Sequence, residues 1–188
     1  VCLSVNKMLP LGWLVKLSNR LNNYEGWSIY LNALQHLRHD DEVSEKVLLL
    51  QQNEYQYPDT EFYYIILRNS GHLFPYNSAI QNLQKALSYF QNIGNKFVES
   101  TCLNNIGILY LYQNQETENI RTARKYFIQA KKIMHQLNSN EEYQSTINIG
   151  ISYLCENNPS LALEYFESAQ MLMPDSLSFD MLKLKCNI

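Results

Sequence analysis

The stretch Ser145–Pro174, STINIGISYLCENNPSLALEYFESAQMLMP, decides the fold of this chain. Ala162, Phe166 and Ala169 lie four and three residues apart, so they share one face of a helix. The small residues at both ends of this stripe allow another helix to approach closely, and the aromatic ring fills the space between them. Gly150 is expected to allow the same close approach on the preceding helix. Glycine inside a helix costs about 1 kcal/mol relative to alanine, so its presence there indicates a packing role.

Helix breakers divide this stretch into two short amphipathic helices. Asn157 and Asn158 end the first helix, and Pro159 opens the second, because proline is tolerated in a first helical turn. Pro174 ends the unit, since proline has no backbone N–H to continue the helical hydrogen bonds. The sequence therefore predicts a helix, a tight turn and a second helix.

The order of these residues resembles the tetratricopeptide repeat (TPR), whose pattern combines Leu-Gly, Tyr, Ala, Phe, Ala and Pro at set offsets after a large apolar residue. Thr146 stands in for that first large residue, and the later positions are occupied by Ile149, Gly150, Tyr153, Ala162, Phe166, Ala169 and Pro174. The resemblance implies an all-α fold, an α-solenoid of antiparallel helix pairs.

The same pattern recurs upstream. Its first half recurs 43 residues earlier, at Leu103, Ile106, Gly107 and Tyr110. Its second half recurs 39 residues earlier, at Ala123, Phe127 and Ala130. The difference of four residues predicts a longer loop near Gln113–Thr122, and a weaker third copy contains Ala79, Leu83 and Ala86. Such long periods are similar to those of the TPR variants in bacterial sensor proteins and kinesin light chains.

We predict about ten helices, without strands, in three regions. Residues 1–57 form atypical N-terminal helices or a connector to a missing upstream domain, because the chain begins with Val and reads as a fragment of something longer. Residues 58–174 form the TPR-like repeats, at about 60–92, 96–137 and 141–174, and residues 175–188 form a C-terminal capping helix. Between residues 75 and 171 the helices are expected at 75–92, 96–112, 120–137, 141–155 and 160–171.

Composition excludes several classes of protein. The net charge of −3, with only 18% charged residues, gives no basic footprint for contacting nucleic acid directly. No run of about 18 apolar residues predicts a membrane-spanning helix. The four cysteines are scattered without disulfide or metal spacing, which favours a reducing compartment, and we expect a cytoplasmic location.

The sequence predicts neither an enzyme nor a cofactor or metal site. The one cluster that resembles a metal site, His36–Asp41, lacks the four ligands of a closed zinc shell and is interpreted as a solvated helix end. No glycine-rich phosphate loop or nucleophile motif is present. The carboxylate pair Glu141-Glu142 is placed where a helix begins, as a cap, and His135 is assigned to a solvated helix end.

A binding surface remains. In TPR-like solenoids the first helix of each pair lines the concave side, which implies that the amides of Asn105 and Asn148, in equivalent register, could hold an extended peptide backbone. The predicted partner-binding residues are Thr101, Asn104, Asn105, Ile108, Tyr112, Gln144, Asn148 and Ile151, with Leu111 and Cys155 beside them. The alternative is that these asparagines reflect compositional bias and face water. Basic residues of the second helix are expected to form a solvated face, or alternatively to contact an acidic partner: Arg121, Arg124, Lys125, Lys131 and Lys132.

The functional hypothesis is a non-enzymatic, TPR-like protein- or peptide-binding scaffold, free-standing or part of a larger polypeptide or complex. One alternative is the sensor segment of a larger bacterial signalling protein, such as a STAND-type nucleotide-switch ATPase in regulation or phage defence. A further alternative is the regulatory domain of a peptide-responsive transcription regulator. Either would need an upstream domain, with a phosphate-binding loop in the first case and a helix-turn-helix in the second.

Overall fold

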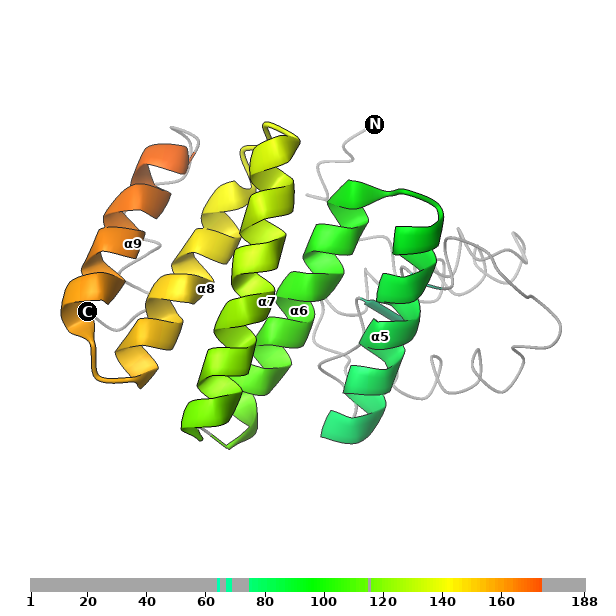
Figure 1. The fold of residues 1–188 in the computed structure, drawn as a ribbon, viewed down its shortest axis with the longest axis horizontal. Helices are drawn as coiled ribbons and strands as arrows, with labels where there is room; N and C mark the ends of the chain where they lie inside the picture. The colour runs from blue at the N-terminus through cyan, green and yellow to red at the C-terminus, as the bar shows by residue number, and fades with distance from the viewer. Residues whose placement is uncertain (1–63, 65–66, 69–74, 115, 174–188) are drawn as a thin grey trace, which may run out of the picture. The chain divides into compact units, whose positions relative to one another are not determined.

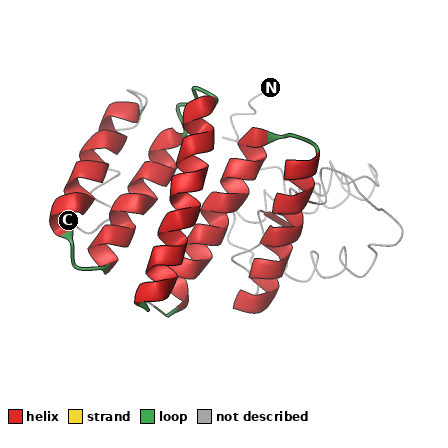
Figure 2. Cartoon of the chain, viewed as in Figure 1, coloured by secondary structure: helices red, strands yellow, loops and turns green. Residues whose placement is uncertain are grey.

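Five α-helices follow one another in the computed structural model, which describes residues 64, 67–68, 75–114 and 116–173. They are α5 (Tyr76–Asn92), α6 (Lys96–Gln113), α7 (Thr117–Gln136), α8 (Glu142–Cys155) and α9 (Pro159–Leu172). Figure 1 shows each helix lying beside the next and running in the opposite direction. Short loops join them, and the described part of the chain contains no strand (Figure 2).

Within the described residues, the predicted all-α class and the predicted helices are therefore confirmed. The other predicted helices, the regions 1–57 and 175–188, and most of the first half of the predicted repeat 60–92 lie outside the described residues. No helix in the described part of the chain is long and apolar enough to cross a membrane.

Small and large residues alternate on the buried faces as the sequence predicts. Ala123 and Ala130 are fully buried on either side of Phe127, which is itself fully buried. Ala162 and Ala169 flank Phe166 in the same way. The ring of Phe127 packs in one core cluster with residues of α6, α7 and α8, and the ring of Phe166 packs in another with residues of α8 and α9.

Two glycines face these rings. A Cβ atom added to Gly107 would lie 2.5 Å from Cε1 of Phe127, and one added to Gly150 would lie 2.5 Å from Cε1 of Phe166. Neither ring leaves room for a methyl group, so glycine is required by close approach at both positions. The packing reason expected for Gly150 is thereby found, and it applies equally to Gly107.

The expectation of a longer loop near Gln113–Thr122 is wrong. Three residues separate α6 from α7, and three separate α8 from α9. The extra residues instead lengthen the helices, because α6 and α7 have 18 and 20 residues whereas α8 and α9 have 14 each. No proline or glycine interrupts the polar sequence around Glu118, so this segment forms the first turn of α7 rather than a loop.

Left-handed residues end three of the helices in the same manner. Gly94, Asn138 and Asn157 have φ angles of 72°, 49° and 56° and follow α5, α7 and α8. At α8, Asn157 N–H donates to the Leu154 carbonyl at 2.9 Å and Asn158 N–H donates to the Tyr153 carbonyl at 2.9 Å. This is the Schellman arrangement, in which a residue of positive φ satisfies the last carbonyl groups of a helix.

Asn157 supplies a first testable prediction. Asn157→Ala is expected to lower the free energy of unfolding by about 1 kcal/mol, because a Cβ-bearing residue without a polar side chain is disfavoured in the left-handed region. The matched variant Asn157→Gly is expected to be at least as stable as the parent, since glycine adopts this conformation freely. Urea denaturation of the three proteins checks this, and equal destabilisation by both variants would contradict it.

Candidate partner-binding face

The amides of Asn104 and Asn148 meet between α6 and α8. Asn148 Nδ2 donates to Asn104 Oδ1 at 2.9 Å, and the hydroxyl of Ser145 donates to the same oxygen at 3.3 Å. Asn105 and Asn148 occupy equivalent positions on α6 and α8. Equivalent positions on successive helix pairs point in the same direction, so these two side chains do not face each other. Asn104 instead occupies the edge of α6 that faces α8, so it is the residue that Asn148 reaches.

Further hydrogen-bonding capacity remains at this amide pair. Asn104 Nδ2 and Asn148 Oδ1 make no hydrogen bond with any described residue. Both side chains are half-buried rather than sealed in the core. An amide nitrogen and an amide oxygen therefore remain available at the junction of the two helices, which matches the acceptor and donor groups of a peptide backbone.

The other predicted partner-binding residues divide into exposed and supporting ones. Tyr112 is 66% exposed, and Gln144 is exposed as well. Ile108 and Ile151 are half-buried and pack against the core cluster around Phe127. Leu111, which the sequence placed beside these residues, is buried in that same cluster.

Two polar residues of α6 complete the predicted set. The Thr101 hydroxyl donates to the Val98 carbonyl of its own helix at 2.8 Å, so part of its hydrogen-bonding capacity is satisfied locally. Asn105 is half-buried and already interacts with its surroundings. None of the eight predicted partner-binding residues is charged, so the face that they form on α6 and α8 is polar but neutral.

Cys155 ends α8 at an exposed position on this side of the helix. Desolvation raises the pKa of the Cys155 thiol above its ordinary value, and the nearby charge of Arg124 opposes this only in part. A raised pKa keeps the thiol protonated near neutral pH, and the thiolate is the nucleophilic form. The environment of Cys155 therefore does not activate it.

The sequence placed Arg124 on a solvated face, and the structure shows this to be wrong. Its guanidinium donates to the Ser152 hydroxyl at 2.7 Å, to the Ser152 carbonyl at 3.0 Å and to the Glu156 carboxylate at 2.6 Å. It also lies 3.8 Å from the ring centroid of Tyr153. Only 13% of its side chain is exposed, so Arg124 joins α7 to α8. The helical spacing of residues within α7 could not reveal partners located 28 and 32 residues away in the sequence.

Glu142 and His135 also act between helices. Glu142 is buried in the first turn of α8, where one carboxylate oxygen lies 3.0 Å from His135 Nδ1 and the other 3.9 Å from Lys131 Nζ. The expected capping role is not observed, because Glu141 occupies the N-cap and makes no side-chain cap hydrogen bond. Glu99, 43 residues earlier, is likewise buried and pairs with Lys96 at 2.7 Å while accepting a hydrogen bond from Gln91 of α5.

Stacked tyrosines join the helices within each pair. Tyr110 stacks on Tyr126 with a centroid distance of 5.7 Å, and Tyr153 stacks on Tyr165 at 5.5 Å. Tyr76 of α5 meets the edge of Tyr110 at 6.1 Å. Desolvation, followed by the proximity of Tyr110, raises the pKa of Tyr76 to about 12, so this hydroxyl stays neutral well beyond physiological pH.

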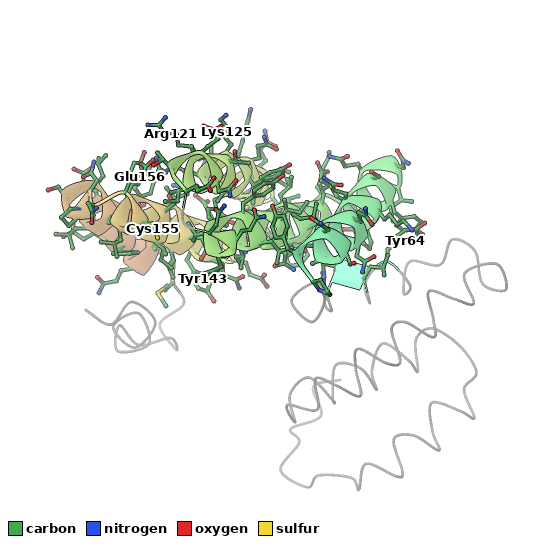
Figure 3. All side chains as sticks on the ribbon, turned by 90° about the horizontal axis from the view of Figure 1, so that it is seen from below. Tyr64, Arg121, Lys125, Tyr143, Cys155 and Glu156 are labelled. Atoms are coloured by element: carbon green, nitrogen blue, oxygen red, sulfur yellow. The ribbon has the colours of Figure 1, made fainter. Side chains whose placement is uncertain are left out.

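Figure 3 separates the two sides of the helices. Arg121 and Lys125 project from the upper side in this view, whereas Tyr143 and Cys155 lie below them. The described residues include no group of three or more His, Cys, Asp or Glu side chains that could hold a metal ion. No protein-family model matches this chain, and no curated protein matches it either.

Proposed function

We propose that this chain is a TPR-like scaffold that binds a protein or peptide on the neutral face of α6 and α8. The observation that carries the proposal is the amide pair of Asn104 and Asn148, which bridges the two helices and leaves the Asn104 amide nitrogen and the Asn148 amide oxygen without a partner among the described residues. An extended backbone laid across the junction can donate to one group and accept from the other.

Recurring contacts support the TPR-like part of the proposal. The helix pairs α6–α7 and α8–α9 have the same glycine against the same phenylalanine and the same tyrosine stack, at sequence offsets of 43 and 39 residues. Two helix pairs with identical internal contacts are what a solenoid of stacked repeats requires. In such a solenoid, the first helices of successive pairs lie side by side and form one surface.

A binding role rather than catalysis is favoured by the use of three acidic side chains in the packing of the described helices. Glu99, Glu142 and Glu156 all form ion pairs, the last two between neighbouring helices. A carboxylate held in such a pair contributes to the packing of the helices. A ligand without strong charge fits a neutral face, whereas an acidic C-terminus would require lysines or arginines there. The cytoplasmic location stays a prediction from the cysteine pattern.

A random peptide library displayed on phage tests this function. Peptides selected on the full chain are expected to bind Asn104→Ala/Asn148→Ala about tenfold more weakly, because each lost hydrogen bond is worth about 0.5–1.5 kcal/mol. Gln84→Ala is the matched control, since Gln84 is an exposed amide on α5. Thermal melts must show that all variants are folded. Peptides that bind the double variant as tightly as the parent would overturn the proposed site.

A further inference from the structure

The outward faces of α5, α7 and α9 can be compared position by position. The buried residues that fix the register are Ala79, Leu83 and Ala86 on α5, Ala123, Phe127 and Ala130 on α7, and Ala162, Phe166 and Ala169 on α9. Because helical residues three and four apart share a face, the exposed residues between these positions form one stripe on each helix. Corresponding stripe residues therefore have the same orientation relative to the core.

The stripe of α7 is basic. It consists of Arg121, Lys125, Ile128 and Lys132, all of which are exposed. Arg121 lies 3.5 Å from Glu156 but remains 62% exposed. Neither Lys125 nor Lys132 lies within ion-pair distance of an acidic group among the described residues. With five basic residues and one acidic residue, α7 is strongly positive within a chain whose net charge is negative.

The corresponding stripe of α9 has the opposite character. It consists of Ser160, Glu164, Glu167 and Met171, again all exposed. Glu164 corresponds to Lys125, and Met171, which is 88% exposed, corresponds to Lys132. α9 has no basic residue at all, and neither glutamate forms an ion pair among the described residues.

On α5 the same stripe is uncharged, with Asn77, Gln81, Gln84 and Ser88 at its four positions. The outward stripe of α5 is therefore neutral and polar. The stripes of α7 and α9 carry opposite charges, and each also contains one exposed apolar residue. Solvation alone does not require this division of charge. The division matches the complementary potentials that direct association between protein surfaces.

We propose that two copies of this chain associate through these outward faces, with the basic stripe of α7 in each copy against the acidic stripe of α9 in its partner. A twofold axis forms both contacts at once, because one copy supplies both complementary surfaces. Ile128 and Met171 provide the apolar part of the contact, and the unbranched Met side chain adapts readily to an irregular surface. The Asn104–Asn148 pair is unaffected, since it lies between α6 and α8 on the neutral face.

Other occupants fit these stripes less well. A nucleic acid attracted by α7 would be repelled by Glu164 and Glu167, and a membrane surface requires a broad apolar face that a single isoleucine does not provide. A second copy satisfies the positive and the negative stripe together. Because the contact is largely charged and exposed, association is expected to be weak and to decrease about tenfold or more between about 50 and 500 mM NaCl.

Two charge-reversed variants test the proposal by sedimentation velocity of the full chain. Lys125→Glu/Lys132→Glu makes both stripes acidic, and Glu164→Lys/Glu167→Lys makes both stripes basic. Each variant alone is expected to be monomeric at concentrations where the parent is dimeric. An equimolar mixture of the two is expected to dimerise, because every acidic stripe then faces a basic one.

A control variant distinguishes this interface from a general effect of altered surface charge. Gln81→Glu/Gln84→Glu adds two charges on α5 and is expected to leave the parent dimer intact. A monomeric parent, a charge-reversed variant that still dimerises alone, or a mixture that stays monomeric would each overturn the proposal. Peptide binding at Asn104 and Asn148 is measured separately, so the failure of either proposal leaves the other testable.

Discussion

Replacing Phe127 with alanine is expected to lower the free energy of unfolding by about 3–5 kcal/mol, because truncation removes buried surface and leaves a cavity. The ring is fully buried and packs in one cluster with Leu111 of α6, Ile120 of α7 and Ile149 of α8. It therefore connects three consecutive helices. Alanines 123 and 130 on either side are too small to refill the space, so little relaxation is expected.

Phe166→Ala provides the comparison. Phe166 is 6% exposed, and among the described residues its cluster consists of residues of α8 and α9 together with Met173, so its loss is expected to cost less and to act locally. In a chain whose helices contact mainly their neighbours, the stability of each region depends on adjacent interfaces. Native-state hydrogen exchange is expected to show faster exchange of α8 and α9 in Phe166→Ala, and of α6, α7 and α8 in Phe127→Ala.

Leu83→Ala on α5 serves as a control of similar chemistry at the other end of the described helices, since Leu83 is 1% exposed. Its effect on exchange is expected to centre on α5 and α6. Uniform loss of protection over all five helices in every variant would show that the region unfolds as a single unit. That outcome would contradict the prediction that each substitution destabilises mainly the helices next to it.

The helices and their internal contacts could be predicted because the information is local. Ala162, Phe166 and Ala169 share a face through their spacing, and Pro159 defines a helix start by backbone chemistry alone. Asn158, predicted only to end the preceding helix, occupies the N-cap of α9, where its side chain accepts a hydrogen bond from the Leu161 N–H at 3.3 Å. Such features require no knowledge of distant residues.

Contacts between helices could not be predicted in the same way. The Asn104–Asn148 bond and the Arg124–Glu156 bond join residues 44 and 32 positions apart, and each depends on the rotation of two helices about their axes. A one-position error in register moves a side chain by about 100° around a helix, since an α-helix has about 3.6 residues per turn. For this reason the sequence grouped Asn104, Asn105 and Asn148 among the candidate partner-binding residues without predicting the bond between Asn104 and Asn148, and it assigned Arg124 to solvent.

Gly107→Ala has the second large expected effect, and its sign is informative. Alanine favours a helix over glycine by about 1 kcal/mol, so an uncrowded site would be stabilised. The new Cβ would instead lie 2.5 Å from one ring carbon of Phe127 and 2.8 Å from the next. The ring has little room to retreat, because it is fully buried in a cluster with Leu111, Ile120 and Ile149. Overpacking is therefore expected to prevail, with a net loss of about 1–3 kcal/mol in urea denaturation.

Gly94→Ala distinguishes crowding from backbone strain. An added Cβ at Gly94 meets no atom within 4 Å, but the residue has a φ of 72°. Its replacement is expected to cost about 1 kcal/mol through backbone strain alone. Changing Phe127 cannot relieve that strain, whereas it can relieve a steric clash.

A double-mutant cycle makes use of this difference. Phe127→Leu alone is expected to destabilise the protein, but combined with Gly107→Ala it removes the ring edge that the new methyl group would strike. The double variant is therefore expected to be about 1–2 kcal/mol more stable than the sum of the single effects predicts. The same cycle between Gly94→Ala and Phe127→Leu is expected to be additive. Additivity at both sites would show that Gly107 is present for a reason other than the approach of the Phe127 ring.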